Sequence, residues 1–222
     1  MIAKEFINHT FPSVKNQDIT ERIFDWMDEY GVRQLPVIND GAYVGIISED
    51  ELFELDLETG VNLNNQKLNY RDVFIAPYTH LYDILNIIGE HDIELVAVVD
   101  EHNKFLGTIL IKELVPAIAK IFASQIPGGI IVLKIDAIQY SLAEISRLIE
   151  ANGVRILSSF VQAVPDDPKV LFITLKLNTQ DLSHVLATLE RFSYQVLNQF
   201  SNVPLKDNSS ERIQLLLKYL EM

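Results

Sequence analysis

One supersecondary pattern occurs twice in this chain. The first copy spans residues 33–52 and reads as a strand, a tight Asp40-Gly41 turn, a second strand and a helix start at Ser48-x-x-Glu51. The second copy spans residues 94–114 and carries one extra turn residue. The matching pairs are Leu35/Val96, Val37/Val98, Ile38/Val99, Gly45/Gly107, Ile47/Ile109, Glu51/Glu113 and Leu52/Leu114. An internal repeat limits the possible folds more than any other feature of the sequence.

The motif itself resembles a known family. Residues 35–52, LPVIND-GAYVGIISEDEL, follow a predicted helix that stops at Gly31. They are similar to a cystathionine-β-synthase (CBS) domain, whose signature is a Leu-Pro-Val strand and then Gly, two hydrophobic residues, Thr or Ser, two further residues and Asp. Two such copies in tandem resemble a Bateman module. The resemblance implies a CBS pair over residues 1–125, with the first repeat at about 1–58 and the second at about 68–125.

Composition limits the classes of partner. The chain has 222 residues, a net charge of −13 and no cysteine. The negative charge argues against nucleic acid or anionic lipid as a partner, and the lack of cysteine excludes disulfides and thiolate metal sites. We find neither a signal-peptide pattern nor an apolar run of about 20 residues, the length a membrane span needs. We therefore expect a cytoplasmic protein with no membrane contact.

Several helix boundaries can be predicted inside the two repeats. Residues 2–8 predict a short helix, and Asp18-x-x-Glu21 predicts a capping box for a helix that ends at Gly31. Further helices are expected from Glu49 to about Leu57, from His80 to Glu90, and from after Leu114 to Ala123 with Pro116 as a kink or restart. Residues 58–69 read as a polar linker between the repeats.

A different order of strands and helices is expected after the break at Ile126-Pro127-Gly128-Gly129. The expected strands are 130–135, 154–164, 170–177 and 194–199, and the expected helices are 142–151 and 181–192. The order β-α-β-β-α-β is ferredoxin-like, so the fold class is α+β. Asn208-x-x-Glu211 opens a C-terminal helix at 207–222, whose apolar stripe must dock on this domain or on a second subunit.

The segment NGVRILSSFV, residues 152–161, resembles part of an ACT domain, a small regulatory module that often binds amino acids. We therefore expect an ACT-like domain at 129–202. A CBS pair followed by an ACT domain resembles the layout of acetoin-utilisation regulatory proteins. The resemblance implies an effector loop that contains Asp136, Tyr140 and Ser141. Because this loop lacks the glycine of the family, we expect it to support dimerisation better than tight amino-acid binding.

No arrangement of residues predicts catalysis or a metal site. The five histidines do not form a two-ligand spacing on one element, so ordinary surface residues are the favoured interpretation: His9, His80, His91, His102 and His184. The chain has neither a nucleophile elbow nor a glycine-rich phosphate loop before a helix. Glu49, Asp50 and Glu51 favour a solvated first helical turn over a metal triplet. We expect no enzyme, no cofactor and no metal.

The CBS resemblance implies a site for an adenosine nucleotide. In such pairs the Thr or Ser hydroxyl and the Asp hold phosphate and ribose, and the Pro-Val strand lines the base. In the first repeat these positions are Ser48 and Glu51, although Ser48-x-x-Glu51 is also a complete capping box that needs no ligand. The full set of candidate binding residues is Val14, Leu35, Pro36, Val37, Ser48, Glu51, Lys112 and Glu113.

The second repeat is a weaker site. Leu110 stands at the hydroxyl position and Ala97 at the proline position, so only Lys112 is left to reach a phosphate. The acidic residues 49–51 disfavour a polyphosphate, so AMP or another monoanionic adenosyl ligand is a better candidate than ATP.

These observations predict a non-enzymatic regulatory protein. In it a CBS pair senses a small adenosyl ligand, and an ACT-like domain dimerises and passes the change to an unknown target protein. The alternative is a structural or interaction module whose ligand sites have decayed. We expect a homodimer, because two helix faces are more apolar than one small sheet requires: Ile19/Ile23/Trp26/Met27 and Leu81/Ile84/Leu85/Ile88.

Overall fold

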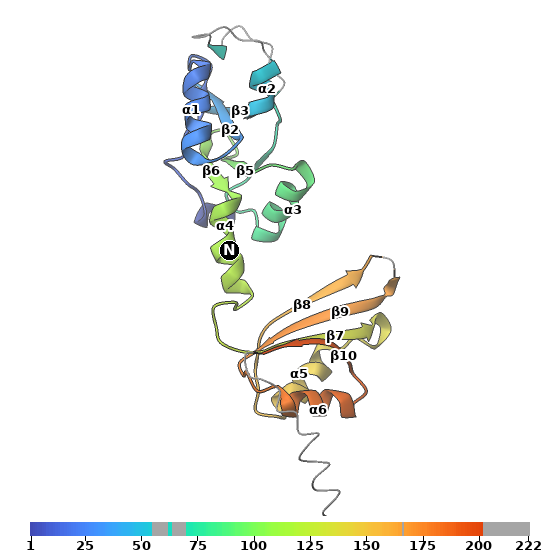
Figure 1. The fold of residues 1–222 in the computed structure, drawn as a ribbon. Helices are drawn as coiled ribbons and strands as arrows, with labels where there is room; N and C mark the ends of the chain where they lie inside the picture. Colours follow the sequence, from blue (N-terminus) through green and yellow to red (C-terminus); the bar gives the residue numbers. More distant parts are fainter. Residues whose placement is uncertain (55–61, 64–69, 166, 202–222) are drawn as a thin grey trace, which may run out of the picture. The chain divides into compact units, whose positions relative to one another are not determined.

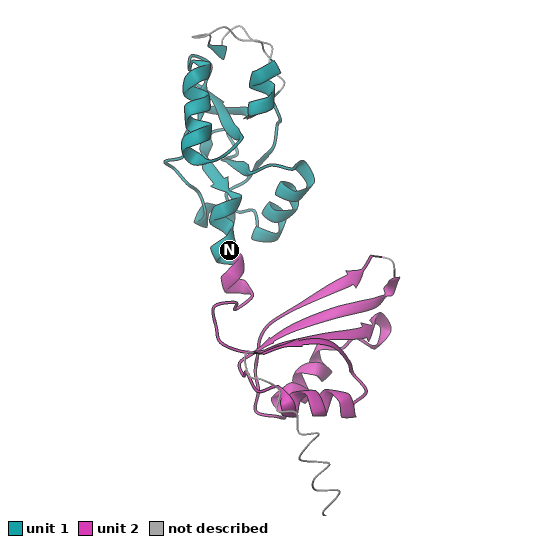
Figure 2. Ribbon diagram, in the orientation of Figure 1, with its two compact units in different colours: residues 1–117 teal, residues 118–222 magenta. Residues whose placement is uncertain are grey.

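The computed structural model describes residues 1–54, 62–63, 70–165 and 167–201 (Figure 1). The chain divides into two compact units, Met1–Ala117 and Ile118–Met222 (Figure 2). The expected C-terminal helix at 207–222 and most of the expected linker at 58–69 lie outside the described residues. The domain limits 1–125 and 129–202 stay predictions.

Each repeat in unit 1 builds a three-stranded sheet of the same kind. The first sheet has the order β1-β2-β3 and the second β4-β5-β6; the outer pairing is parallel and the hairpin pairing antiparallel. The register agrees as well, since Val14 pairs with Val37 and Ile75 with Val98. The elements are η1 (Ala3–Glu5), β1 (Val14–Lys15), α1 (Thr20–Tyr30), β2 (Gln34–Asn39), β3 (Ala42–Ser48), α2 (Glu49–Glu54), β4 (Phe74–Ile75), α3 (Leu81–His91), β5 (Leu95–Val99), β6 (Phe105–Leu110) and α4 (Ile111–Ile121).

Local sequence signals explain most of these elements. Asp40 and Gly41 both have positive φ, 49° and 83°, as a two-residue hairpin turn of type I′ requires. The Ser48-x-x-Glu51 capping box is present, because the Glu51 amide donates to Ser48 Oγ and the Ser48 amide donates to the Glu51 carboxylate. Gly31 ends α1 in the left-handed conformation, with φ 61°.

Three boundary predictions are wrong. Asp18 does not cap α1, which begins at Thr20 after Ile19; the Asp18 carboxylate instead accepts the backbone N–H of Lys15 at 2.8 Å. The expected helix at 2–8 is only the 3₁₀ turn Ala3–Glu5, because neighbouring backbone groups pair with the second repeat. The last helix of the unit also starts earlier than expected, at Ile111, and contains Pro116.

The two repeats exchange the segments that lead into them. Asn8, ahead of β1, forms a bridge with Thr108 on β6, with N–O distances of 2.8 and 3.2 Å. Arg71, ahead of β4, forms the equivalent bridge with Ile46 on β3, at 3.0 and 3.1 Å. Each sheet is therefore extended by a segment that belongs to the other repeat, and neither repeat is complete alone.

The repeated glycine of the motif makes this exchange possible. A Cβ on Gly45 would lie 2.5 Å from the Tyr70 Cβ, and a Cβ on Gly107 would lie 2.9 Å from the Asn8 carbonyl oxygen. Real Cβ atoms do not approach a neighbour so closely. Gly45 and Gly107 therefore leave room for the incoming backbone, which is the physical reason that both copies carry glycine there.

Unit 2 has the ferredoxin-like fold predicted from the sequence. Its antiparallel sheet has the order β10-β7-β9-β8, and the elements follow the order β-α-β-β-α-β. The helices α5 and α6 lie on one face of this sheet (Figure 1) and close a core with Ile131, Leu133 and Ile173. The elements are β7 (Ile130–Asp136), η3 (Ala137–Gln139), α5 (Leu142–Glu150), β8 (Ile156–Val164), β9 (Asp167–Leu177), α6 (Ser183–Arg191) and β10 (Gln195–Phe200).

The segment exchange predicts a sharp difference between two glycines. Gly107→Ala should lower the free energy of unfolding by about 1–3 kcal/mol, because the new methyl group overlaps the incoming strand at Asn8. Gly89 is the matched control: it is exposed on α3, and a methyl group on its Cα would have no neighbour within 4 Å. Gly89→Ala should raise stability by about 0.5–1 kcal/mol.

Urea unfolding of the full chain measures both changes. Equal effects of the two substitutions would contradict the role given to Gly107.

Candidate ligand cleft between the two repeats

A cleft of about 460 Å³ lies where the two repeats of unit 1 meet. This volume falls within the range of small-molecule sites. Both repeats contribute to its walls. The first supplies residues of β2, β3 and α2, and the second supplies the lead-in to β4, the loop between α3 and β5 and the start of α4. The lining residues are Arg33, Gln34, Ser48, Glu49, Asp50, Arg71, Asp92, Ile93, Glu94 and Ile111.

Two nearly buried polar side chains lie side by side in this cleft. Gln34 on β2 and Ser48 on β3 are cross-strand partners, with exposed fractions of 7% and 9%. Burying polar groups is costly unless each finds a hydrogen-bond partner. The partners of these two residues therefore decide what the cleft can still offer to a ligand.

Glu94 joins the repeats at the base of the cleft. Its carboxylate accepts the backbone N–H of Arg33 at 2.8 Å, and its own backbone N–H donates to the side-chain oxygen of Gln34 at 3.0 Å. Within each repeat a matching backbone bond holds the same place, from the Glu49 amide to the Arg33 carbonyl in the first and from the Ile111 amide to the Glu94 carbonyl in the second. Because both repeats are tied together here, a ligand in the cleft touches the junction between them.

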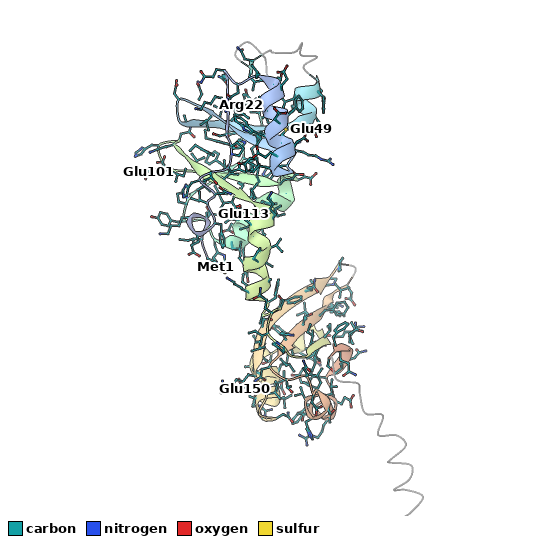
Figure 3. All side chains as sticks on the ribbon, turned by 60° about the vertical axis from the view of Figure 1, so that its left-hand side comes forward. Met1, Arg22, Glu49, Glu101, Glu113 and Glu150 are labelled. Carbon is teal, nitrogen blue, oxygen red and sulfur yellow. The ribbon has the colours of Figure 1, made fainter. Side chains whose placement is uncertain are left out.

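The charged groups around the cleft are mixed but mainly acidic. Arg33 and Arg71 supply the positive charge, and Arg71 Nη1 donates to the carbonyl of His91 at the end of α3. The carboxylates of Glu49, Asp50, Asp92 and Glu94 line the same space. Figure 3 labels Glu49 at the start of α2. One phosphate could be neutralised by the two arginines, whereas a triphosphate would face an excess of carboxylates.

The Ser48 hydroxyl and the Glu51 carboxylate satisfy each other. Ser48 Oγ donates to Glu51 Oε2 at 2.9 Å, and the same oxygen accepts the Ser48 backbone N–H at 2.7 Å. Glu51 is one methylene longer than the Asp of the family pattern, and this length lets it fold back onto Ser48. Of these two predicted binding residues, only Ser48 lines the cleft.

The equivalent positions of the second repeat are occupied differently. Leu110 is buried, and Glu113 accepts the side-chain amide of Asn8 at 2.7 Å. Figure 3 shows Glu113 in the first turn of α4. Lys112 Nζ donates to the carbonyl of Tyr30 at 2.7 Å, at the end of α1, and Lys112 is not among the residues that line the cleft. A shallower hollow of about 460 Å³ lies beside Glu113, lined by residues 5–10.

The predicted hydrophobic wall does not line the cleft. Val14, Leu35 and Val37 have no exposed surface, and Pro36 is buried with them in the core of the first sheet. The structure brings Ser48 together with Arg71, Ile93 and Glu94 of the other repeat instead. The reason is the segment exchange, which turns the Ser48 end of β3 toward the second repeat.

Sequence reasoning missed three of the residues that matter here: Gln34, Arg71 and Glu94. Glu94 and Arg33 occupy matching positions of the two copies, 61 residues apart, so the repeat itself carried a signal for this junction. No sequence pattern marked Arg71, which follows the expected linker between the repeats.

The predicted effector loop of unit 2 uses its polar groups internally. Asp136 accepts the amide of Ile138 at 2.9 Å, and Ser141 caps α5 by accepting the amide of Glu144 at 3.3 Å. Tyr140 packs against the core of the unit. A hollow of about 600 Å³ lies beside Asp136 and Tyr194, and burial together with the Glu144 charge raises the pKa of Tyr194 above its ordinary value.

The described residues hold neither a cluster of metal ligands nor a membrane span. No three His, Asp, Glu or Cys side chains in that part of the chain gather closely enough to hold a metal ion. None of the helices described there is both long and apolar enough to cross a membrane.

Comparison with known proteins links unit 1 to one family. The model of the CBS domain family matches residues 3–58 and 69–120. Among similar solved structures, a CBS domain pair/ACT domain protein from Thermotoga maritima is 23% identical, with 53% of this chain and 96% of that chain covered and a TM-score of 0.48. CBSX2 in complex with AMP is 22% identical, with 54% and 97% covered and a TM-score of 0.46. CBSX2 comes from Arabidopsis thaliana. With TM-scores below 0.5, these structures assign no ligand to this chain.

The mutual bonding of Ser48 and Glu51 predicts an energetic coupling. Ser48→Ala and Glu51→Ala should each lower the free energy of unfolding by about 1 kcal/mol. The double variant should lose less than the sum, by at least about 0.5 kcal/mol, because both changes remove the same bonds. Urea unfolding of the four proteins measures this cycle.

Ser141→Ala is the matched control, because Ser141 also caps a helix three residues before a glutamate but lies in unit 2. Combined with Glu51→Ala it should give additive losses. Additivity of Ser48→Ala with Glu51→Ala would refute the coupling.

Proposed function

Because residues 3–58 and 69–120 form a tandem pair of CBS domains, we propose that this chain is a non-enzymatic regulatory protein that senses an adenosyl ligand. The ligand, AMP or a similar adenosyl monophosphate, binds in the cleft between the repeats. The observation that carries this proposal is the cleft itself, which is built by both repeats and retains Ser48 at the hydroxyl position of the motif. CBSX2, a protein similar to this one, has been solved with AMP.

Charge supports a monophosphate over a triphosphate. The whole net charge of −13 comes from residues 1–117, since residues 118–222 hold as many basic as acidic side chains. A polyphosphate would approach this unit against its field, and four carboxylates line the cleft beside two arginines. A single phosphate next to Arg33 and Arg71 avoids most of that repulsion.

The cleft also suggests how binding is transmitted. Its walls include Arg71 of the exchanged segment and Glu94 of the junction, so a ligand contacts both repeats at once. A ligand that binds one packing of the repeats better than another shifts the population toward it. Arg71 holds the end of α3 through the His91 carbonyl, so a phosphate that engages Arg71 competes with this cap.

We also propose that unit 2 is an ACT-like domain and that the chain is a homodimer acting on a target protein. The exposed apolar surface is smaller than the sequence indicated, because Ile23, Met27, Leu81, Ile84 and Ile88 are buried inside unit 1. What is left on the helices includes Phe53, 66% exposed, whose ring lies 5.0 Å from that of Phe24. This aromatic pair on α1 and α2 is the surface we favour for the contact between two copies.

A second candidate function is a structural or interaction module without a ligand. It is favoured by the mutual bonding of Ser48 and Glu51 and by Leu110 at the second hydroxyl position. In that case both repeats are retained for assembly alone.

Calorimetric titration distinguishes the two candidates. We expect AMP to bind the full chain with a micromolar dissociation constant, and ATP without a divalent cation to bind at least tenfold more weakly because of the acidic lining. Equal affinity for AMP and ATP would contradict the charge argument. No binding of AMP, adenosine or ATP would favour the interaction module.

The twenty amino acids serve as a control panel in the same experiment. Because Asp136 and Ser141 already cap backbone amides, the effector loop should bind none of them at micromolar concentration. A micromolar amino acid would make unit 2 the sensor.

Sedimentation equilibrium tests the dimer. The full chain should be a dimer at tens of micromolar, and Phe53→Glu should weaken the association because it buries a charge in the contact. Tyr78→Glu is the control, since Tyr78 is exposed to 72% on a different part of unit 1. A monomeric wild-type chain would contradict the proposal, and an unchanged dimer in Phe53→Glu would assign the contact to other residues.

A further inference from the structure

Gln34 is a polar side chain in an unusual position. It starts β2, is exposed to only 7%, and lines the cleft next to Ser48. Its side chain also crosses from the first repeat to the second, where it meets the backbone of Glu94. A carboxamide carries both a donor group and an acceptor group, so the partners of its two ends decide its role.

The hydrogen bond to Glu94 fixes which end faces which way. The Glu94 backbone N–H can only donate, so the Gln34 oxygen must face it, at the observed 3.0 Å. Turning the amide over would set two N–H donors against each other. Gln34 is thereby locked with its NH₂ group directed away from Glu94, and in the part of the chain that the structure describes this group has no hydrogen-bond partner.

The neighbours of Gln34 show that the free donor is available for a ligand. Ser48, opposite on β3, uses its hydroxyl for Glu51. The two cations of the cleft, Arg33 and Arg71, are exposed, whereas Gln34 is nearly buried. Since a phosphate keeps more of its hydration beside exposed cations, the donor of the nearly buried Gln34 side chain suits the uncharged end of the ligand.

We propose that Gln34 is the specificity-determining residue of the cleft, whose locked amide donates a hydrogen bond to an uncharged acceptor on the ligand, such as a ring nitrogen of a base. This inference rests on the function proposed above and adds which residue selects the ligand. When a bound ligand displaces water from this donor, a molecule that offers a C–H or a second donor at the same place is rejected, because the amide is then left unpaired.

The second repeat lacks such a donor. Leu95 stands at the position that matches Gln34 and has no exposed surface, and buried Leu110 stands opposite it on β6. The pair Gln34 and Ser48 thus corresponds to two leucines. Of the two matching positions in the described residues, only the one in the first repeat carries polar side chains that can select a ligand. The expected stoichiometry is therefore one ligand per chain.

The test pairs changes in the ligand with changes in the protein. The ligands are AMP and its 1-deaza, 3-deaza and 7-deaza analogues, each of which replaces one ring nitrogen by C–H. Wild-type protein should bind one of the three analogues about five- to tenfold more weakly than AMP, as expected for one lost hydrogen bond. In Gln34→Leu the difference between AMP and that analogue should disappear, whereas a merely structural role would leave it unchanged.

Gln34→Glu is a second variant that tests the same contact if the leucine variant does not fold. A carboxylate still accepts the Glu94 N–H but has no donor, so the junction is kept while the proposed contact is lost. Adenosine is the probe for this variant, because it carries no phosphate that the new charge could repel. We expect about fivefold weaker adenosine binding at a temperature where the variant is still folded. Its melting temperature should be lower than that of the wild type, because the new charge is nearly buried among the carboxylates of the cleft.

The outcomes separate the two proposals. Suppose that wild-type protein binds AMP, and that the dissociation constant of every deaza analogue relative to that of AMP is the same in Gln34→Leu as in the wild type. The role of Gln34 is then refuted while the function stands. Unchanged adenosine binding in Gln34→Glu refutes it equally. If wild-type protein binds neither AMP nor adenosine, the proposed function fails and this inference fails with it.

Discussion

The exchange of backbone segments between the two repeats is the constraint on which unit 1 depends. Each sheet has only three strands, and its third strand bonds to a segment that belongs to the other copy, at Asn8 and at Arg71. Gly45 and Gly107 permit this because any side chain there would overlap the incoming strand. The hairpin tips also meet, since the Tyr43 amide donates to the Asn103 carbonyl. The two copies therefore form a single structure rather than two independent domains.

The cleft follows from this exchange. Crossing the lead-in segments turns the Ser48 end of one motif toward Ile93 and Glu94 of the other, so the cleft lies at the junction of the copies. A ligand at such a junction can change how the copies pack, which is what a sensor requires. The two related positions have diverged, with polar Gln34 and Ser48 on one side and buried Leu95 and Leu110 on the other.

The sequence alone predicted the repeated hairpins, the capping box at Ser48 and the β-α-β-β-α-β order of unit 2, because turns, caps and hydrophobic periodicity are local signals. It failed at Asp18, where a complete capping pattern was present but the carboxylate bonded to the Lys15 amide instead. For the candidate site it identified Ser48 but not Gln34 or Arg71. Contacts across the repeats depend on which strand crosses to which sheet, and a single repeat motif does not contain that information.

We propose above that the cleft between the repeats is a ligand site to which residues of both copies contribute contacts. A crystal structure of the full chain grown with AMP tests it most directly. We expect one AMP per chain in the cleft, with its base within hydrogen-bond distance of the Gln34 amide nitrogen and its phosphate beside Arg33 and Arg71. AMP bound beside Glu113 or Tyr194, or a cleft that stays empty at saturating AMP, would contradict it.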